Sequence, residues 1–190
     1  MREVPNLVFG SSDAERRWLA YGTQDGGQGV SIIEARSGKP VKELPIGDAN
    51  TFFSPDGRWL VTTTGRATTP GGECSLWRTD TWEKVGPPRP LRRSSSSPAH
   101  ALVSPDGTMV AVAYTMSEVR LLHLETLEEI ATLTAPEPGL IVALEFSPDG
   151  RQLFAGMANM VQFWDLHALR RGLRGIGLDW EMPGPTESAN

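Results

Sequence analysis

The chain has 190 residues, a formal net charge of −5 and a single cysteine, Cys74. An acidic balance argues against nucleic acid or an anionic membrane as the main partner, and the longest uncharged apolar stretch, Gly139–Leu144, is far shorter than the ~18 residues of a membrane span. One cysteine excludes an intrachain disulfide and a thiolate cluster, and Met1–Gly10 lacks the features of a signal peptide, so we expect a location in the reducing cytoplasm.

The first third of the chain predicts short strands separated by turns. Met1–Phe9 reads as an inner strand, and Ser11–Ala14 as the turn that follows it. The next three strands are expected at Arg17–Tyr21, Val30–Ile33 and Lys42–Leu44. Alternation of apolar and polar residues, with many β-branched and aromatic side chains, favours strands over helices.

The same order of strands recurs three more times. In the second unit the strands after the turn are Arg58–Thr64, Cys74–Trp77 and Glu83–Val85; in the third they are Met109–Tyr114, Val119–Leu122 and Glu129–Leu133; in the fourth they are Gln152–Gly156 and Val161–Trp164. No outer strand follows Leu166 in the fourth unit. The ends of the third strands, Ile33, Trp77, Leu122 and Trp164, are spaced by 44, 45 and 42 residues.

One tetrapeptide, Ser-Pro-Asp-Gly, opens three of these units at spacings of 50 and 43 residues. Its chemistry suits a tight turn, because proline fixes φ, aspartate bonds nearby backbone and glycine accepts positive φ. The three copies are Ser54, Pro55, Asp56 and Gly57; Ser104, Pro105, Asp106 and Gly107; and Ser147, Pro148, Asp149 and Gly150. Four strands per period of 42–45 residues predict the blades of a β-propeller.

The predicted fold is therefore all-β: a partial propeller of about four blades of four-stranded antiparallel sheet, the last blade lacking its outer strand. The blades are expected at about residues 4–46, 49–86, 99–134 and 140–166. In residues 167–190, leucines and Ile176 at helical spacing predict a short helix packed on the last blade, followed by a disordered tail from Glu181. A basic helix lying on a membrane is the alternative for this segment.

At this point the chain resembles the WD40 repeat family, over roughly residues 4–166. The resemblance is carried by the Ser-Pro-Asp-Gly turns and by Trp164-Asp165, and it implies structural roles for Trp77, Trp164 and Asp165. The repeats are degenerate, because no Gly-His opens them and the family's hydrogen-bonded tetrad is nowhere complete. The segment after Leu169 looks like the tail that ends WD40 arrays in large bacterial signalling proteins, many of which carry a serine/threonine kinase domain.

The resemblance implies a non-catalytic scaffold for protein-protein interaction. Closed rings take roughly four to eight blades, and WD40 rings usually take seven. We therefore expect the chain to be the C-terminal portion of a larger propeller, or to close its ring with a second copy.

No catalytic, cofactor-binding or metal-binding motif stands out. The three histidines are scattered and no nucleophile elbow occurs, so we expect no enzyme activity, cofactor or metal. The glycine-rich run Gly22–Gly29 favours a hairpin turn over a phosphate cradle, and Cys74 a core position over a reactive thiol. The alternative function is an enzyme-associated, small-molecule-binding or metal-binding propeller, which would use the polar inner positions Asn50, Thr51, His100 and Glu145.

Two enlarged loops, Gly65–Glu73 and Gly86–Pro98, emerge on one face of the ring in the family's topology. Arg66, Arg89, Arg92 and Arg93 lie in these loops and could form a basic patch for an acidic or phosphorylated peptide; the alternative is a solvated, variable loop. Ser94–Ser97 follow two arginines and resemble a kinase target, whose phosphorylation would add charge beside the arginines.

Overall fold

The structure is a computed structural model that describes residues 7–23, 29–47, 49–64, 72–91, 100–157 and 159–177. These residues contain four antiparallel sheets, which we call blades 1 to 4, and one helix. The sheet topology confirms the predicted fold class, including the fourth blade of three strands.

Each blade is a simple meander in which consecutive strands are neighbours. Blade 1 contains β1 (Leu7–Ser12), β2 (Trp18–Thr23), β3 (Val30–Glu34) and β4 (Pro40–Leu44). Blade 2 contains β5 (Asn50–Phe53), β6 (Trp59–Thr63), β7 (Gly72–Arg78) and β8 (Lys84–Leu91). Blade 3 contains β9 (Ala101–Val103), β10 (Met109–Ala113), β11 (Glu118–His123) and β12 (Glu129–Thr134). Blade 4 contains β13 (Ile141–Phe146), β14 (Gln152–Met157) and β15 (Val161–Asp165).

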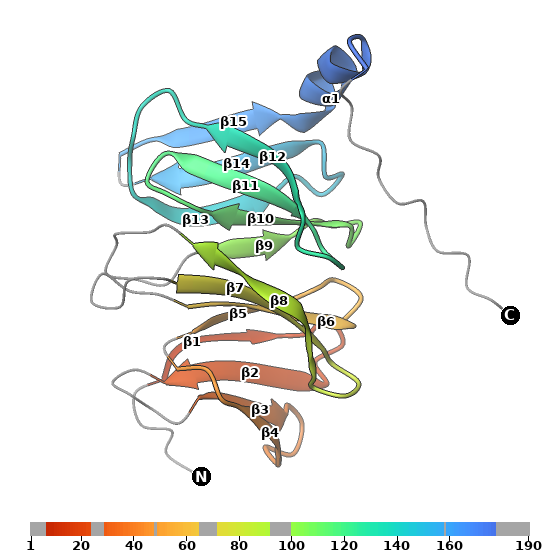
Figure 1. Cartoon of the computed structure of the whole chain (residues 1–190). Coiled ribbons are helices and arrows are strands. Elements are labelled where there is room, and N and C mark those ends of the chain that lie inside the picture. Colours follow the sequence, from red (N-terminus) through yellow and green to blue (C-terminus); the bar gives the residue numbers. More distant parts are fainter. Residues whose placement is uncertain are drawn as a thin grey trace, which may run out of the picture.

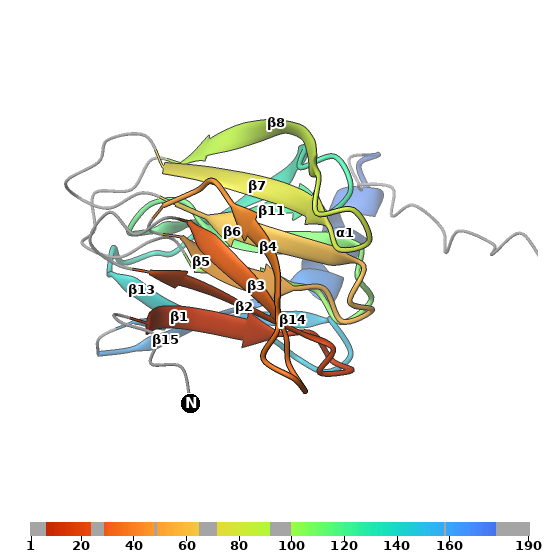
Figure 2. The same cartoon turned by 90° about the horizontal axis from the view of Figure 1, so that it is seen from below.

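The blades stack face to face in chain order, so that blades 1 and 4 lie at opposite ends of the stack (Figure 1). The inner strands form the common edge, since β1 contacts β5, β5 contacts β9 and β9 contacts β13. Viewed from below, the sheets overlap in a stack (Figure 2). This is the arrangement of neighbouring blades in a propeller.

The hydrophobic core lies between the blades in three layers. One layer, with Ile32, Leu60 and Trp77, fills the space between blades 1 and 2. A second, with Cys74 and Val112, lies between blades 2 and 3, and a third follows between blades 3 and 4. Because side chains alternate along a strand, an internal blade can bury apolar residues on both faces, which explains the unbroken burial of β10.

The three Ser-Pro-Asp-Gly turns share one hydrogen-bond pattern. In the first, the Ser54 hydroxyl donates to Asp56 Oδ1 at 2.5 Å and accepts from the backbone N–H of Trp59 at 3.0 Å. The glycine has φ of +67° to +70° in all three copies, a conformation that side chains with a Cβ rarely adopt. The side chains add to the backbone bonds of the turn: Asp56 Oδ1 also accepts from the backbone N–H of Arg58 at 3.0 Å, so the aspartate bonds nearby backbone as the sequence predicted.

The turn of blade 1 lies two residues later than predicted. Asp13, rather than Ser11, occupies the position of Ser54, and its Oδ1 accepts from the backbone N–H of Trp18 at 2.8 Å. Arg16 takes the glycine position with φ of +54°. The turn is therefore Asp13–Arg16, and β1 runs to Ser12 instead of ending at Phe9. An aspartate side chain can accept the same hydrogen bond from a backbone N–H that serine accepts in the other three turns. A search for the tetrapeptide therefore does not find the turn of blade 1.

Two predicted loops are shorter than expected. Residues 86–91 belong to β8, which extends well beyond the predicted Glu83–Val85, and β7 begins at Gly72, so Gly72 and Glu73 are strand residues. The prolines in β8 argued against a strand, yet β8 is an outer edge strand, where a missing N–H disrupts no ladder on the solvent side. Residues 65–71 and 92–99 lie outside the described residues.

The predicted helix is present as α1 (Leu166–Arg174). Asp165 caps it by accepting from the backbone N–H of Ala168 at 2.8 Å. The helix contacts β14 of the last blade, as predicted, and Leu166 is buried in the core layer between blades 3 and 4. Leu169 is 37% exposed and Ile176, beyond the helix, is 69% exposed. Gly175 is the C-cap of the helix. The tail from Glu181 lies outside the described residues.

Candidate partner-binding site

Of the four arginines predicted to form a basic patch, the structure describes Arg89 alone. Arg66, Arg92 and Arg93 lie outside the described residues, as do Ser94–Ser97. Each of the two predicted loops is flanked by strand ends that the structure describes. These ends are Thr63 and Gly72 for the first loop, and Leu91 and Ala101 for the second. They lie at the opposite end of the blades from the Ser-Pro-Asp-Gly turns. We call the end with these strand termini the loop face and the other end the turn face.

The register places Arg89 in the groove between blades 2 and 3. Arg89 is the cross-strand partner of Cys74 on β7, and Cys74 is buried in the core layer between these blades. Cross-strand partners point to the same side of a sheet, so Arg89 faces blade 3. Arg89, Pro90 and Leu91 are the last three residues of β8 and therefore lie at its loop-face end.

Blade 3 places a second arginine in the same groove. Arg120 on β11 is the cross-strand partner of Val112 on β10, and Val112 belongs to the same core layer. Arg120 therefore faces blade 2. Two guanidinium groups from facing sheets thus enter one groove.

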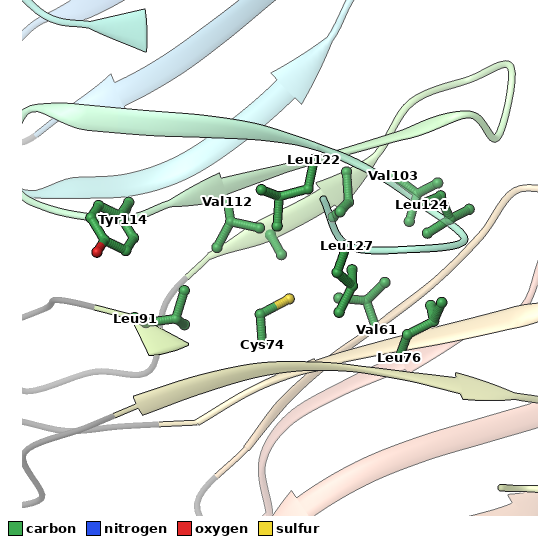
Figure 3. Close-up of a cluster of buried hydrophobic side chains, with 12 residues drawn as sticks. Val61, Cys74, Leu76, Leu91, Val103, Val112, Tyr114, Leu122, Leu124 and Leu127 are labelled. Carbon is green, nitrogen blue, oxygen red and sulfur yellow. The ribbon is translucent and has the colours of Figure 1, made fainter. Parts of the chain in front are cut away.

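The groove contains a pocket of about 170 Å³. Blade 2 contributes the last three residues of β8 to the lining, and blade 3 contributes residues of β10, β11 and β12 and of the segments that follow β10 and precede β12. The lining residues are Arg89, Pro90, Leu91, Val112, Tyr114, Arg120, Leu122, Leu127 and Glu129. Figure 3 shows the apolar part of this lining within the core cluster, with Tyr114 and Leu91 at one end and the Tyr114 hydroxyl pointing away from the other labelled side chains. The pocket thus has an apolar floor and charged walls.

Two contacts fix Arg120 within the pocket wall. Its Cζ lies 3.4 Å from the centroid of the Tyr114 ring, a cation-π contact. Its Nη1 donates to Glu129 Oε2 at 2.9 Å, in an ion pair whose Arg120 side chain is 31% exposed. The Nε atoms of both Arg89 and Arg120 are buried and have no acceptor among the described residues. Two cations and one carboxylate leave the lining with a charge of about +1 in an acidic chain.

Sequence reasoning found one member of this site and missed Arg120, Tyr114, Leu127 and Glu129. The available signal was the repeat register. Leu127 occupies the same turn position as Trp82 and Gly38, and Leu127 and Trp82 adopt positive φ and are buried between blades. Arg120 lies on a strand whose neighbours are apolar, so only the pairing with Val112 shows that it faces a groove.

The other candidate sites resolve into structural features. Burial raises the pKa of the Cys74 thiol to about 12, which confirms Cys74 as a core residue. Gly22 lies in β2 and pairs with Val30, so the glycine-rich run joins two hairpin strands, although residues 24–28 are outside the described part. Among the residues that the structure describes, no group of three or more His, Cys, Asp or Glu side chains could hold a metal ion. The described helix is not long and apolar enough to cross a membrane.

One of the polar inner positions, Thr51, has structural partners in blade 1. Ser11 on β1 and Thr51 on β5 share a hydrogen bond at 3.0 Å, and the Thr51 hydroxyl also lies 3.2 Å from the carbonyl oxygen of Ala20. These bonds join blade 1 to blade 2. His100 immediately precedes β9 of blade 3, and Glu145 lies within β13 of blade 4.

Trp77, Trp164 and Asp165 hold the framework. Buried Trp77 donates from Nε1 to Thr62 Oγ1 at 3.0 Å, joining neighbouring strands of blade 2. Trp164 packs against the core layer between blades 3 and 4, and Asp165 caps α1.

Comparison with known protein families identifies one repeat directly. Residues 127–165, which run from the turn before β12 to the end of β15, match the family model described as "WD domain, G-beta repeat". Residues 127–165 are thus similar to a WD40 repeat. WD40 propellers are in general protein-interaction scaffolds.

Solved structures extend this likeness over the fold of nearly the whole chain. The β-propeller domain of Cps50 (Swd1) from Myceliophteria thermophila superposes with a TM-score of 0.68 at 16% sequence identity, over 88% of this chain and 56% of that one. The chain therefore spans little more than half of the propeller domain that it matches. A search of curated protein sequences finds no match.

Proposed function

We propose that this chain is a non-catalytic WD40-repeat scaffold that binds a partner protein through its loop face and the adjoining groove between blades 2 and 3. The pocket in that groove carries the proposal. It combines an apolar floor with two inward-facing arginines, the composition of a site that anchors a side chain of a partner. We place this activity in a cytoplasmic signalling protein. The tail resembles the end of WD40 arrays in large bacterial signalling proteins, and the single cysteine is buried, which suits a reducing compartment.

We further propose that the chain is the C-terminal portion of a larger propeller. The outward face of blade 4 supports this, because Phe154 and Phe163 are cross-strand partners whose rings lie 6.3 Å apart on that face. Phe163 is 57% exposed and Val161, two residues along the same strand, is 69% exposed. A cluster of this kind is typical of an interface, and a further blade of a longer chain would cover it as blade 3 covers the other face. A second copy of the chain is the other occupant that such a face would accept.

Two matched variants test the interaction surface. The first replaces Arg66, Arg89, Arg92 and Arg93 with glutamine. The second replaces four arginines of the turn face, Arg36, Arg58, Arg78 and Arg151, and so removes the same charge. The ion pairs of the control arginines are exposed and contribute little to stability.

Partners cross-linked to each variant in extracts of the native host are quantified by mass spectrometry against wild type. We expect the loop-face variant to lose its most enriched partner and the turn-face variant to retain it. Retention of every partner by both variants, or equal loss from both, would refute the loop face as the binding surface.

A further inference from the structure

We infer that the pocket between blades 2 and 3 binds a single anionic side chain of the partner, a carboxylate or a phosphate, between the guanidinium groups of Arg89 and Arg120. This inference rests on the proposed function and specifies the chemistry of its site. It adds Arg120, which does not belong to the loops, to the binding residues.

Hydrogen bonding in the pocket supplies the first argument. A guanidinium has five N–H donors and no acceptor, and a buried donor without an acceptor is unfavourable. The buried Nε of each arginine finds no acceptor among the described residues, although Nη1 of Arg120 is satisfied by Glu129. An oxyanion offers several lone pairs and could accept from N–H groups of both guanidinium groups at once.

Charge supplies the second argument. The lining holds two arginines and one carboxylate, Glu129, so one positive charge is uncompensated within it. Like charges brought into one partly buried groove repel, and a bound anion removes that repulsion. The groove therefore favours an anionic occupant over a neutral or cationic one, even though the whole chain has a net charge of −5.

Shape and rigidity supply the third argument. A pocket of about 170 Å³ is many times the ~10–15 Å³ that one water needs, and it has room for a carboxylate or phosphate with the methylenes that carry it. The Tyr114 ring and Glu129 hold the guanidinium group of Arg120 in place, and the β-ladder fixes the backbone that carries Arg89. Little conformational freedom would then be lost on binding, which favours affinity.

Titration of the full 190-residue chain with small probes, followed by ¹⁵N NMR, tests the inference without a known partner. The probes are inorganic phosphate and phosphoserine, glutamate and serine, the amino acids being capped at both ends. The Nε–Hε signals of Arg89 and Arg120 should shift saturably with the anionic probes and not with capped serine. Whether phosphoserine or glutamate saturates at the lower concentration identifies the anion.

Variants make the test specific. Arg89→Gln retains most of the side chain, and we expect it to weaken binding of the preferred anion at least tenfold. Arg78→Gln, at an exposed arginine bonded to Asp80, is the matched control and should bind as wild type does. Glu129→Gln should bind the anion several-fold more tightly, because it removes the competing carboxylate. Backbone spectra of the variants verify that each remains folded.

Absence of saturable binding, equal response to capped serine, or wild-type affinity in Arg89→Gln would each overturn the inference. These outcomes are separate from failure of the proposed function. A chain that loses its partners with the loop-face variant but ignores phosphate and glutamate remains a scaffold with a different pocket ligand.

Discussion

Three non-glycine residues in the described ranges adopt the left-handed backbone conformation: Arg16, Trp82 and Leu127. Trp82 and Leu127 are buried between blades, at 8% and 1% exposure, so packing offsets the steric strain of a Cβ at positive φ. Arg16 is exposed and has no such compensation. Positive φ therefore has two roles in this fold. At Arg16 it closes a turn, and at Trp82 and Leu127 it directs an apolar side chain into the groove between neighbouring blades.

Replacing Arg16 with glycine should stabilise the chain by about 0.5–1 kcal/mol. The gain is the relief of a ~1–2 kcal/mol left-handed strain, reduced by the greater freedom of glycine in the unfolded state. Urea unfolding measures it. Arg36→Gly, at an exposed turn residue without positive φ, is the control and should be neutral or destabilising. A destabilised Arg16→Gly would contradict the assignment of Arg16 to the glycine position.

The turn aspartates predict a loss of stability in acid. The Ser147 hydroxyl and the Arg151 backbone N–H donate to Asp149, and they lower the pKa of this carboxyl below its ordinary value of 3.8. For Asp56, partial burial raises the pKa, but hydrogen bonds from Ser54 and Arg58 outweigh it and the net shift is downward. A lowered folded pKa means that the stabilisation is present above pH ~4 and is lost as the pH falls through the folded pKa.

We therefore expect Asp149→Asn to be less stable than wild type at pH 6–7 and to approach it below pH 3. Urea unfolding at both pH values measures the difference, and Glu125→Gln, at an exposed carboxylate of another turn, is the control. A stability gap that stays constant between pH 7 and pH 3 would show that the charged form of Asp149 contributes nothing to folding.

At the scale of single elements, the hydrogen bond from Trp77 to Thr62 ties β7 to β6 inside blade 2. Both side chains are buried, at 5% and 1% exposure. Trp77 belongs to the core layer between blades 1 and 2, so this hydrogen bond lies beside apolar neighbours. Burial strengthens its importance, because an orphaned indole N–H there has no route to water.

Thr62→Val should cost about 1–3 kcal/mol, since the shape is kept and the indole donor is left unsatisfied. Thr62→Ser retains the hydroxyl and should keep the Nε1–Hε1 signal of Trp77 protected from hydrogen exchange. Urea unfolding gives the free energy, and NMR exchange gives the protection. Equal exchange rates in the two variants would contradict the role assigned to this bond.

Most strands were predictable because each carries a period-2 pattern bounded by turn residues. The extension of β8 beyond Val85 escaped prediction because its three prolines are typical of a linker, whereas an outer edge strand needs hydrogen bonds on one side only. The turn of blade 1 escaped because aspartate replaces serine and arginine replaces glycine without changing the geometry. The site was predictable only for Arg89, since Arg120 joins it through strand pairing and blade packing that no local pattern encodes.

At the scale of the whole molecule, the two faces of blade 4 differ. Phe146, Leu153 and Trp164 pack toward blade 3, whereas Phe163 and Val161 are exposed on the other face. The chain also covers just 56% of the propeller domain that it resembles. The exposed side chains support the proposal that a further blade covers the outward face.

Sedimentation velocity over a range of concentrations tests this face. We expect the chain by itself to self-associate through it, and Val161→Glu with Phe163→Glu to sediment as a monomer, because two buried carboxylates would oppose the contact. Met116→Glu, at a 47% exposed residue of blade 3, is the control and should associate as wild type does. A wild-type chain that is monomeric at all concentrations would refute the exposed face as an interface.

The central claim is that the chain is a scaffold that binds an acidic partner in the pocket between blades 2 and 3. The most direct test is calorimetric titration of the captured partner into wild type and Arg89→Gln. We predict saturable binding to wild type and at least tenfold weaker binding to the variant, with Arg78→Gln unchanged. Equal affinity for wild type and Arg89→Gln would contradict the claim.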